Sequence, residues 1–570
     1  MLICGLKFTH DGAIALVKDN KLLFSIEVEK IENNPRFSKI IDTNLIVNIL
    51  EDRGYNVSDV DKFIIDGFGD CAWDQNNKIR NNNEACNGLK FSSDGLNYKI
   101  KLAGYNEQKN NENILREKKY TGLMIANKEY NYSSFYHLAG HIMGAYTSSL
   151  FSKKEESSYV LVWDGGTYPR LYFFDAKRRK ILNLGALFFL YGRIYYVFAH
   201  HFEQFKINPE ILHDNLSVPG KVMAYIALGK NSEELFKIFS DIYINYFYLM
   251  GSTKFFSYES TKFFSHEFKK RIIKDSYKTE DVLCTFHNFI EQLLLKELKS
   301  KILKFNSNNR NLCFVGGSAL NIKWNSAIRE SGLFDKVYVP PFTNDSGSAI
   351  GMACCGMKSL YLDWSVFSGP NIIKNKPVPG WIKEKCPINC LAKILYKENE
   401  PVVILQGKSE LGPRALGNRS IVAPAITHKM KDILNNIKRR EGYRPISPIC
   451  KEDRAKYIFD PGLKDPYMLF NHQVKKEWKN KIPAVIHLDG TARLQTVNKK
   501  ENKNIYKLLD EYEKLSGIPV LCNTSANYLG KGFFPDIKSA TKWGMVNYVW
   551  SDGYLYIKKD KVDIKNYLTI

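Results

Sequence analysis

The segment 407–420 reads GKSELGPRALGNRS and directly follows a short apolar run at 402–405 that predicts a buried strand. Its three glycines, one proline and two arginines suit neither a helix nor a strand. Glycine lets backbone N–H groups approach a ligand closely, and the planar guanidinium of arginine matches phosphate or carboxylate. The sequence therefore predicts an anion-binding loop at the end of a strand, in preference to a merely solvated basic loop.

Three more segments in the last third of the chain carry residues of the same kind. KRREGYRP at 438–445 places four cations within seven residues, and RLQTV at 493–497 adds another arginine. NTSAN at 523–527 follows a predicted strand at 518–521 and supplies short hydrogen-bonding side chains at its carboxyl end, where ligand crevices commonly lie. Together these segments predict a pocket for a nucleotide or a polyphosphate.

Three glycine-containing turns follow predicted strands in the first half of the chain: FTHDG at 8–12, WDGGT at 163–167 and VGGSALN at 315–321. Each can present backbone N–H groups to phosphates, and the first two carry an aspartate that can position a metal ion. Their order resembles the phosphate–phosphate–adenosine layout of actin-like ATPases. The alternative is three ordinary turns between strands and helices.

A histidine pair lies in HLAGH, on a predicted helix at 136–149. His137 and His141 are four residues apart, so both imidazoles lie on one helix face, as a shared metal ion requires. Two histidines on a helix are more often structural, and the segment lacks the glutamate of a zinc-protease helix. Asp164 and Asp345 would complete a mixed nitrogen and oxygen site that suits iron, zinc or manganese.

The length of 570 residues predicts two or three domains. Proline and glycine become frequent at 368–370 and 377–380, so we expect a first domain at 1–363, a linker at 364–389 and a second domain at 390–570. A polar stretch at about 70–128 predicts an insertion. The apolar stretch at 184–198 is too short and too polar to span a membrane and predicts a pair of buried strands.

The formal net charge of +22 would suit a nucleic acid, an anionic membrane or an acidic substrate. The lysines are dispersed, however, and are not interleaved with aromatic residues as a base-stacking surface needs, so a compositional bias explains the charge better. A nucleic-acid partner is therefore not expected, although the charge leaves it open. Eleven cysteines without a CxxC pair, and a first apolar run interrupted by Lys7, predict reduced thiols in a cytoplasmic protein without a signal peptide.

The order GKSELGPRALGNRS, KRREGYRP, RLQTV and NTSAN resembles the O-carbamoyltransferases that modify nodulation factors, aminoglycosides, cephalosporins and other natural products, and the likeness extends over nearly the whole chain. It implies an α/β protein with an N-terminal actin-like, ribonuclease-H-like ATPase-type domain followed by a YrdC-like α/β domain. It also implies ATP (with Mg²⁺) and carbamoyl phosphate as co-substrates, a carbamoyl-adenylate intermediate and a divalent metal, foremost Fe²⁺. The acceptor would be a small-molecule hydroxyl of the sugar, aminoglycoside or polyketide type.

The resemblance assigns roles to individual residues. His137, His141, Asp164 and Asp345 would hold the metal, and His10 with Asp11 would face the acceptor, His10 as general base. Contacts to the nucleotide and phosphates would come from Gly316, Gly317, Asn321, Lys408, Arg414, Arg419, Lys438, Arg444, Arg493, Asn523, Ser525 and Asn527. The chain departs from the family pattern at Pro219 (usually Glu), Lys408 (usually Arg) and Ala526 (usually aromatic), and its Glu/Arg-rich segment is degenerate near 33–37.

Two other functional classes agree with the same motifs. A threonylcarbamoyl-adenylate enzyme that modifies tRNA would share both fold types and would use the positive charge, with a steep salt dependence of binding. A regulatory protein that binds nucleotides without chemistry would show neither metal nor turnover. The sequence alone does not identify the acceptor.

Overall fold

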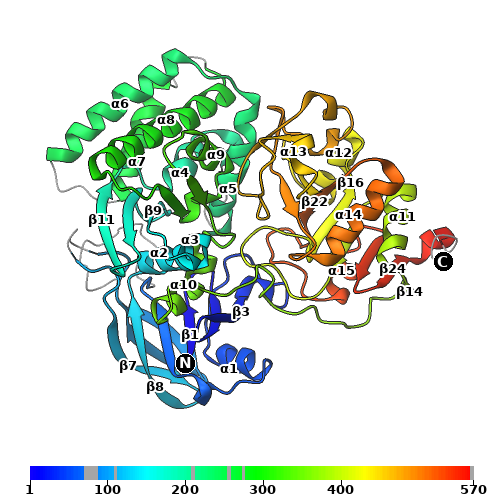
Figure 1. The fold of residues 1–570 in the computed structure, drawn as a ribbon, viewed down its shortest axis with the longest axis horizontal. Helices are drawn as coiled ribbons and strands as arrows, with labels where there is room; N and C mark the ends of the chain where they lie inside the picture. Colours follow the sequence, from blue (N-terminus) through cyan, green and yellow to red (C-terminus); the bar gives the residue numbers. More distant parts are fainter. Residues whose placement is uncertain (70–87, 108–111, 207–211, 253–257, 273–276, 565–570) are drawn as a thin grey trace. The chain divides into compact units, whose positions relative to one another are not determined.

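A computed structural model describes residues 1–69, 88–107, 112–206, 212–252, 258–272 and 277–564, which form two compact units (Figure 1). The first unit contains Met1–Val28 and Phe37–Ser365, and the second contains Glu29–Arg36 and Val366–Ile570. The chain therefore enters the second unit briefly before it completes the first.

The first sheet of the first unit begins with an antiparallel meander of three apolar strands, β1 (Leu2–Lys7), β2 (Ala13–Lys18) and β3 (Lys21–Glu27). β4 (Lys62–Asp66) then pairs parallel to β1, and β8 (Lys128–Phe135) pairs parallel to β4. β7 (Lys118–Ile125) closes the edge antiparallel to β8. The resulting order is β3-β2-β1-β4-β8-β7.

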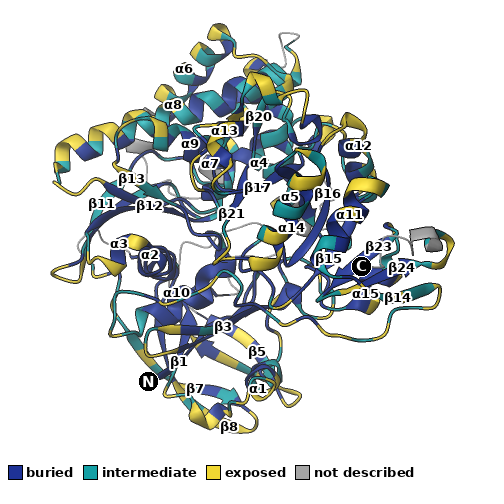
Figure 2. Ribbon diagram, turned by 45° about the vertical axis from the view of Figure 1, so that its right-hand side comes forward, coloured by how far each residue is buried: buried dark blue, intermediate teal, exposed yellow. Residues whose placement is uncertain are grey.

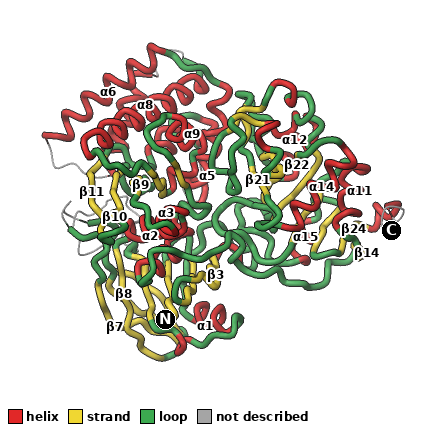
Figure 3. Tube along the Cα trace, viewed as in Figure 1, coloured by secondary structure: helices red, strands yellow, loops and turns green. Residues whose placement is uncertain are grey.

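The second sheet repeats this plan (Figure 3). β9 (Ser158–Val162), β10 (Arg170–Asp175) and β11 (Lys180–Ala186) form the antiparallel meander, and β12 (Asn311–Val315) and β13 (Lys336–Tyr338) add parallel strands beside β9. A meander followed by parallel strands on the far side of its first strand is the ribonuclease-H-like arrangement. Its duplication gives the actin-like fold that the sequence predicts.

Two helices pack between the sheets, α2 (His137–Ser148) and α10 (Ser348–Cys355). Every residue of α2 is buried, and so is nearly all of α10 (Figure 2). A Cβ on Gly351 would lie 2.0 Å from the carbonyl oxygen of Gly140, so only glycine allows this approach. Because α2 carries both histidines and Asp345 lies just before α10, this contact fixes the relative positions of three of the four predicted metal ligands.

The remaining described strands and α-helices of the first unit are a hairpin, α1 beside the first sheet, and further helices, of which the long α6, α7 and α8 form a group beside the second sheet (Figure 1). They are β5 (Gly88–Ser93), β6 (Leu96–Lys101), α1 (Asn44–Glu51), α3 (Leu150–Lys153), α4 (Ile194–Ala199), α5 (Leu212–Tyr225), α6 (Glu233–Ser252), α7 (Tyr258–Ile272), α8 (Thr279–Phe305) and α9 (Ile322–Glu330). Among the described residues, none of the helices has the length and hydrophobicity needed to cross a lipid bilayer.

The second unit is built on a mixed sheet of order β14-β24-β23-β15-β16-β22-β17-β21. Its strands are β14 (Trp381–Lys385), β15 (Val402–Leu405), β16 (Arg419–Pro424), β17 (Ser447–Lys451), β21 (Gln495–Val497), β22 (Val520–Ser525), β23 (Tyr548–Ser551) and β24 (Tyr554–Lys558). Helices α11 (Ile388–Glu398) and α14 (Lys503–Ser516) contribute to one apolar core, and α12 (His428–Ile437), α13 (Ala455–Ile458) and α15 (Ile537–Trp543) to the other. A small sheet joins β18 (Phe459–Asp460), β19 (His472–Val474) and β20 (Thr491–Ala492).

The segment Glu29–Arg36 is held in the second unit by its own contacts. Lys30 Nζ is buried and donates to the carbonyl oxygens of Glu410 (2.6 Å) and Gly412 (2.8 Å). Arg36 N donates to Gly530 O (3.0 Å). The segment Glu29–Arg36 therefore contacts the loop 407–420 through Lys30, and the sequence did not predict this contact.

Several sequence predictions differ from the structure. The stretch 184–198 is not a strand pair: it contains the end of β11, a connection and the start of α4, because its mixed apolar and aromatic pattern fits a helix as well as a strand. The strand predicted at 518–521 continues as β22 to Ser525, so Asn523 and Ser525 lie within the strand. The bounds of the domains, the linker and the insertion stay predictions: β14 lies in the predicted linker and β5, β6 and β7 in the predicted insertion, while 70–87 and 108–111 lie outside the described residues.

Candidate metal centre and phosphate-binding site

His137 and His141 lie on successive turns of α2 and point toward the same place. Both are buried, and their Nε2 atoms are 3.1 Å apart. Asp345 Oδ1 is 3.4 Å from His137 Nε2 and 3.3 Å from His141 Nε2. Asp164, in the turn after β9, completes the group, and one ligand atom from each of the four residues lies within 4.8 Å of the others. The structure thus brings the four predicted metal ligands together.

This donor set fits a divalent transition metal. Two nitrogens bound about 2.1 Å from one ion, at roughly a right angle, lie about 3 Å from each other, as these do. Two imidazoles with two carboxylates suit iron, zinc or manganese better than calcium or magnesium, which prefer oxygen alone. Asp164 is fixed by two donors, Tyr105 Oη (2.6 Å) and the backbone N–H of Gly317 (3.0 Å).

Two residues that sequence reasoning missed, Asp66 and Lys7, orient these ligands. The Asp66 carboxylate, at the end of β4, lies 2.9 Å from His137 Nδ1 and so directs the Nε2 lone pair toward the metal position. Lys7 Nζ, at the end of β1, lies 3.1 Å from Asp345 Oδ2 and 3.3 Å from Asp66 Oδ1. His10 Nε2 is also 3.1 Å from Asp345 Oδ2, so Oδ1 is the oxygen left facing the two histidines. A charged residue at the end of an apolar strand was the available signal for both.

The buried charges of this centre are strongly coupled. Burial alone would lower the pKa of His137, but Asp66 and Asp345 raise it to about 10. Burial would likewise raise the pKa of Asp66, but His137 and Lys7 lower it to about 2. The three carboxylates Asp66, Asp164 and Asp345 and the ammonium of Lys7 sum to −3 + 1 = −2, with neutral imidazoles. A divalent cation, if bound with both imidazoles neutral, would balance this charge.

Replacement of Lys7 by methionine is expected to shift metal selectivity toward trivalent ions. The net charge falls from −2 to −3, and the added attraction is half again as large for a trivalent as for a divalent ion. We expect the ratio of Ga³⁺ to Mn²⁺ affinity to rise by about tenfold or more, measured by competition dialysis. Lys18→Met, an exposed lysine on β2, is the matched control. An unchanged ratio in a folded K7M protein would show that Lys7 does not set the charge of the site.

The glycine turn 315–321 has one contact with the metal centre and one structural role. Gly316 has φ 98° and a Cβ there would lie 2.5 Å from Trp163 O, so the residue must be glycine. Gly317 donates its N–H to Asp164 Oδ1, as stated above. Asn321 Oδ1 accepts from the backbone N–H groups of Lys323 and Trp324 and so caps α9. A contact from Gly316, Gly317 or Asn321 to a nucleotide stays a prediction.

In the second unit, the loop 407–420 is organised around a buried carboxylate. Glu410 Oε1 accepts from the backbone N–H groups of Leu416 (2.7 Å), Asn418 (2.7 Å) and Arg419 (3.1 Å). Arg419 is buried, and its guanidinium donates to four backbone carbonyls, including Gln406 O at 2.7 Å and Gly407 O at 3.1 Å. Arg419 thus fastens the loop in this conformation. Lys408 is half-buried, and its carbonyl accepts from the Asn418 amide at 2.7 Å.

Two other predicted motifs hold the loop next to Arg414. Asn523 Nδ2 on β22 donates to Ala415 O (3.0 Å) and to Gln495 Oε1 (2.7 Å). Gln495 Nε2 in turn donates to Leu416 O (2.9 Å). RLQTV and NTSAN therefore act first as supports that position the backbone on either side of Arg414.

Five arginines gather around this loop: Arg36, Arg414, Arg440, Arg444 and Arg493, here called the arginine cluster. Burial and the neighbouring Arg36 and Arg444 lower the pKa of Arg414 to about 10. Burial, Arg444 and Arg36 lower that of Arg440 to about 9. Burial and the charges of Arg414, Arg440 and Arg444 lower the pKa of Arg493 well below its ordinary value, and Asp465 acts in the opposite direction.

Hydrogen bonds and long ion pairs tie members of the cluster to their neighbours, among them the pair of Arg36 with Glu29 at 3.9 Å. Arg493 Nε donates to Ser447 Oγ (2.9 Å), and Arg440 Nη1 to Thr524 Oγ1 (3.4 Å). The weak ion pair of Arg444 with Glu441 spans 3.8 Å. Half-buried cations that depress one another's pKa are stabilised by a polyanion, so the cluster is the best candidate for a phosphate site. The sequence did not single out Arg36 and Arg440 as site residues. Arg36 lies far in the sequence from the other four arginines, and Arg440 is one of several cations in the segment 438–445.

Lys438 has a different role from the arginines. Its Nζ donates to Ser525 O (2.8 Å), Asn527 O (3.1 Å) and Asn527 Oδ1 (2.6 Å), which uses its three donors. Asn527 Nδ2 donates to the carbonyls of Tyr528 and Lys531. In this conformation Lys438 and Asn527 therefore close the end of β22, and a direct contact from either to phosphate stays a prediction.

Comparison with known proteins identifies the family. Residues 2–354 match the family model of the carbamoyltransferase N-terminus, and residues 392–556 that of the C-terminus. The chain belongs to the carbamoyltransferase family. It is 44% identical over 574 residues to nodulation protein U of Rhizobium tropici, with 98% of this chain and 96% of the relative covered. It is 30% identical to the 3'-hydroxymethylcephem-O-carbamoyltransferase of Amycolatopsis lactamdurans, over 94% of each chain.

These matches confirm the family that the sequence predicts, and the chain is an enzyme. Of the three functional classes that the motifs allowed, only carbamoyl transfer agrees with the family, and the class of non-catalytic regulators is excluded. A glucokinase from Balamuthia mandrillaris is a structural match at TM-score 0.25 and 10% identity, covering 62% of this chain and 92% of that one. The assignment of the actin-like fold rests instead on the duplicated strand order.

Proposed function

We propose that this carbamoyltransferase transfers a carbamoyl group, in two ATP-dependent steps, to a hydroxyl of a small-molecule acceptor. The second unit would form carbamoyl-adenylate, and the first unit would pass its carbamoyl group to the acceptor. The observation that carries the first step is the arginine cluster, a half-buried excess of cations. The four converging metal ligands beside His10 support the second step.

The activation step needs both phosphate neutralisation and a leaving group. Carbamoyl phosphate would first give carbamate and inorganic phosphate by hydrolysis. A carbamate oxygen then attacks the α-phosphorus of ATP, the bond from the α-phosphorus to the bridging oxygen breaks, and pyrophosphate leaves. Arg414, Arg444 and Arg493 would stabilise the charge that moves onto the phosphates, and Arg36 and Arg440 would add to the same field. Mg²⁺ would accompany ATP.

In the transfer step the acceptor oxygen attacks the carbamoyl carbon, the bond from that carbon to the phosphate oxygen breaks, and AMP leaves. His10 would take the hydroxyl proton, and the carboxylate of Asp345 at 3.1 Å would stabilise the imidazolium that forms. Asp11, whose Oδ1 accepts from Asn344 Nδ2 at 3.4 Å, would help to orient the acceptor. A divalent metal held by His137, His141, Asp164 and Asp345 would supply Lewis acidity toward the carbamoyl oxygen.

The acceptor is proposed at the level of chemical class. The curated cephem relatives are named for carbamoylation at a hydroxymethyl group. A hydroxyl on a sugar, aminoglycoside or polyketide would use the same chemistry here. We propose a cytoplasmic reaction, because ATP is the co-substrate and the cysteines among the described residues are free thiols.

Arg414→Ala is expected to remove most pyrophosphate release from ATP and carbamoyl phosphate. The loss of one charge-assisted phosphate contact in a buried site costs on the order of 2–4 kcal/mol, so roughly 30- to 1,000-fold in rate. A coupled pyrophosphate assay measures it. Arg454→Ala, at a more exposed arginine outside the cluster, is the control. Pyrophosphate release at the wild-type rate by a folded R414A protein would contradict the assignment of the activation site.

A further inference from the structure

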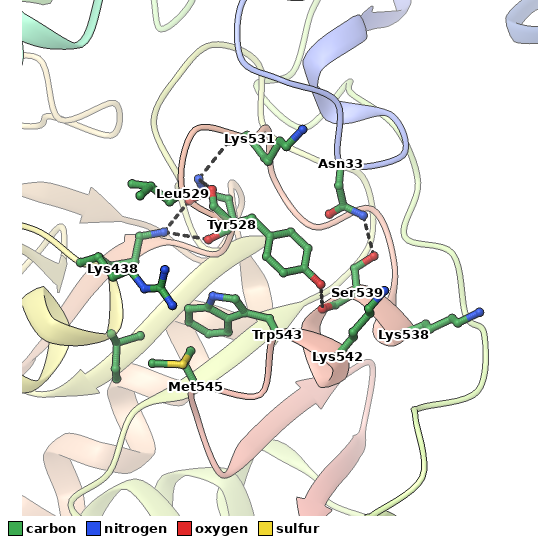
Figure 4. Close-up of a pocket in the computed structure, with 13 residues that line it drawn as sticks. Asn33, Lys438, Tyr528, Leu529, Lys531, Lys538, Ser539, Lys542, Trp543 and Met545 are labelled. Atoms are coloured by element: carbon green, nitrogen blue, oxygen red, sulfur yellow. Dashed lines mark hydrogen bonds between the residues drawn. The ribbon is translucent and has the colours of Figure 1, made fainter. Parts of the chain in front are cut away.

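A cavity of about 790 Å³ lies in the second unit, beside the end of α12, the turn after β22 and α15 (Figure 4). None of the five arginines of the arginine cluster lines it. Its volume falls in the range typical of small-molecule sites. The cavity therefore differs in its lining from the arginine cluster, and it lies next to Lys438 and Asn527, two of the predicted nucleotide contacts, which also line it.

The charge of this cavity has one sign. Besides Lys438, whose Nζ is bonded to Ser525 and Asn527, the cations Arg439, Lys531, Lys538 and Lys542 line it, and no aspartate or glutamate is among its described lining residues. Within the part of the chain that the structure describes, none of these four cations forms an ion pair. A concave surface of one charge focuses its field and attracts an anion, and lysine ammonium groups act as point charges for phosphate.

The wall of the cavity carries two aromatic rings that are held rigidly. Trp543 and Tyr528 both pack against Phe534, with ring centroids 5.4 Å and 5.1 Å from it. Tyr528 Oη donates to Ser539 O at 2.9 Å, as Figure 4 shows. Both rings are half-buried, and Met545 lies near Trp543 in the same view. Preorganised aromatic faces favour a ligand with a planar ring, since stacking on them is worth about 1–3 kcal/mol for a nucleobase.

The polar groups of the lining argue against a sugar phosphate. Asn527 makes internal hydrogen bonds through both ends of its amide. Asn33 Nδ2 donates to Ser539 Oγ at 2.7 Å, so little remains to recognise several hydroxyls. Asn33 Oδ1, in contrast, is buried without a hydrogen-bond partner. This oxygen is closed to solvent, so a ligand in the cavity would meet the two rings and the cations and not Asn33 Oδ1.

We propose that this cavity is a binding site for an adenine nucleoside monophosphate, with the phosphate held by Lys531, Lys538, Lys542 and Arg439 and the base on Trp543 and Tyr528. The class of ligand follows from the cavity itself. The identification of that ligand as AMP rests on the proposed function, because the transfer step releases AMP. The fraction of the protein with this site occupied would then rise with the concentration of AMP, the product of the transfer step.

The test uses AMP as the probe, with the full chain in isothermal titration calorimetry. Titrations in the Arg414→Ala background weaken the contribution of the arginine cluster, and the comparison with the control pair isolates what this cavity adds. In that background, Lys538→Glu with Lys542→Glu should weaken AMP binding by about tenfold or more, since two phosphate contacts are reversed in charge. The control pair is Lys393→Glu with Lys397→Glu, both exposed on α11 in the other apolar layer of the unit. It changes the net charge equally and should bind AMP as its parent does.

Two fragments test the ring and the phosphate separately. Adenosine and inorganic phosphate should each bind at least about tenfold more weakly than AMP. The proposal is overturned if AMP binds the Lys538/Lys542 variant as tightly as the control pair, or if inorganic phosphate binds as tightly as AMP. Preferential binding of a single-stranded oligonucleotide over AMP would equally overturn it in favour of a nucleic-acid surface. These outcomes are independent of pyrophosphate release by the Arg414 variant, which tests the proposed function.

Discussion

Replacing His137 and His141 together by alanine is expected to leave the protein without a bound transition metal and without carbamoyl transfer. The two imidazoles supply half of the four converging ligands, and the remaining Asp164 and Asp345 form a site of oxygen ligands that holds a transition metal weakly. Elemental analysis of protein purified without chelators should find about one metal per chain in the wild type, foremost iron, and none in the double variant. Transfer from preformed carbamoyl-adenylate should be lost in parallel.

The control for this experiment is His266→Ala with His428→Ala, a pair of exposed histidines away from both sites. Because the double variant leaves Lys7, Asp66 and Asp345 buried, circular dichroism must show that it folds. Asp164→Asn, which keeps the size of the side chain, offers a milder second variant. Retention of the metal by the folded double variant, or a metal-free wild type, would mean that the histidines are structural.

The parts of the sites that could be predicted from the sequence are those with local patterns. HLAGH needs only helical periodicity to bring two imidazoles to one face. The glycines of the segment 407–420 predict an irregular loop without reference to any other segment. The strands β1, β2, β4, β9 and β12 are apolar runs bounded by polar turns, so they too could be found. Since turns after parallel strands meet at one edge of a sheet, Asp164 could be placed near the glycine turn 315–321.

The parts that could not be predicted depend on distant segments that the fold brings together. Nothing local to Lys7 or Asp66 shows that each lies within 3.3 Å of a partner from another element. Arg36 reaches the arginine cluster only because Glu29–Arg36 crosses into the second unit. Arg419 and Asn523 look like phosphate ligands in the sequence, yet they bind backbone carbonyls, because a tight loop with few regular hydrogen bonds needs such donors.

His10→Asn is expected to separate the two half-reactions. His10 belongs to the first unit, whereas the arginine cluster belongs to the second, so the variant should still release pyrophosphate and form carbamoyl-adenylate at the wild-type rate. Transfer to an acceptor hydroxyl should fall by about 100- to 10,000-fold, the usual cost of losing a general base. Asparagine keeps a hydrogen-bonding group near Asp345 but cannot take up a proton, so the loss should be one of chemistry with little change in metal content.

Both activities are measured on the same sample, with His266→Asn as the control. If both fell equally, one shared site would explain the data better than two coupled units. Unimpaired transfer would leave His10 as a hydrogen-bonded partner of Asp345 alone, and the proton would have to leave by another route.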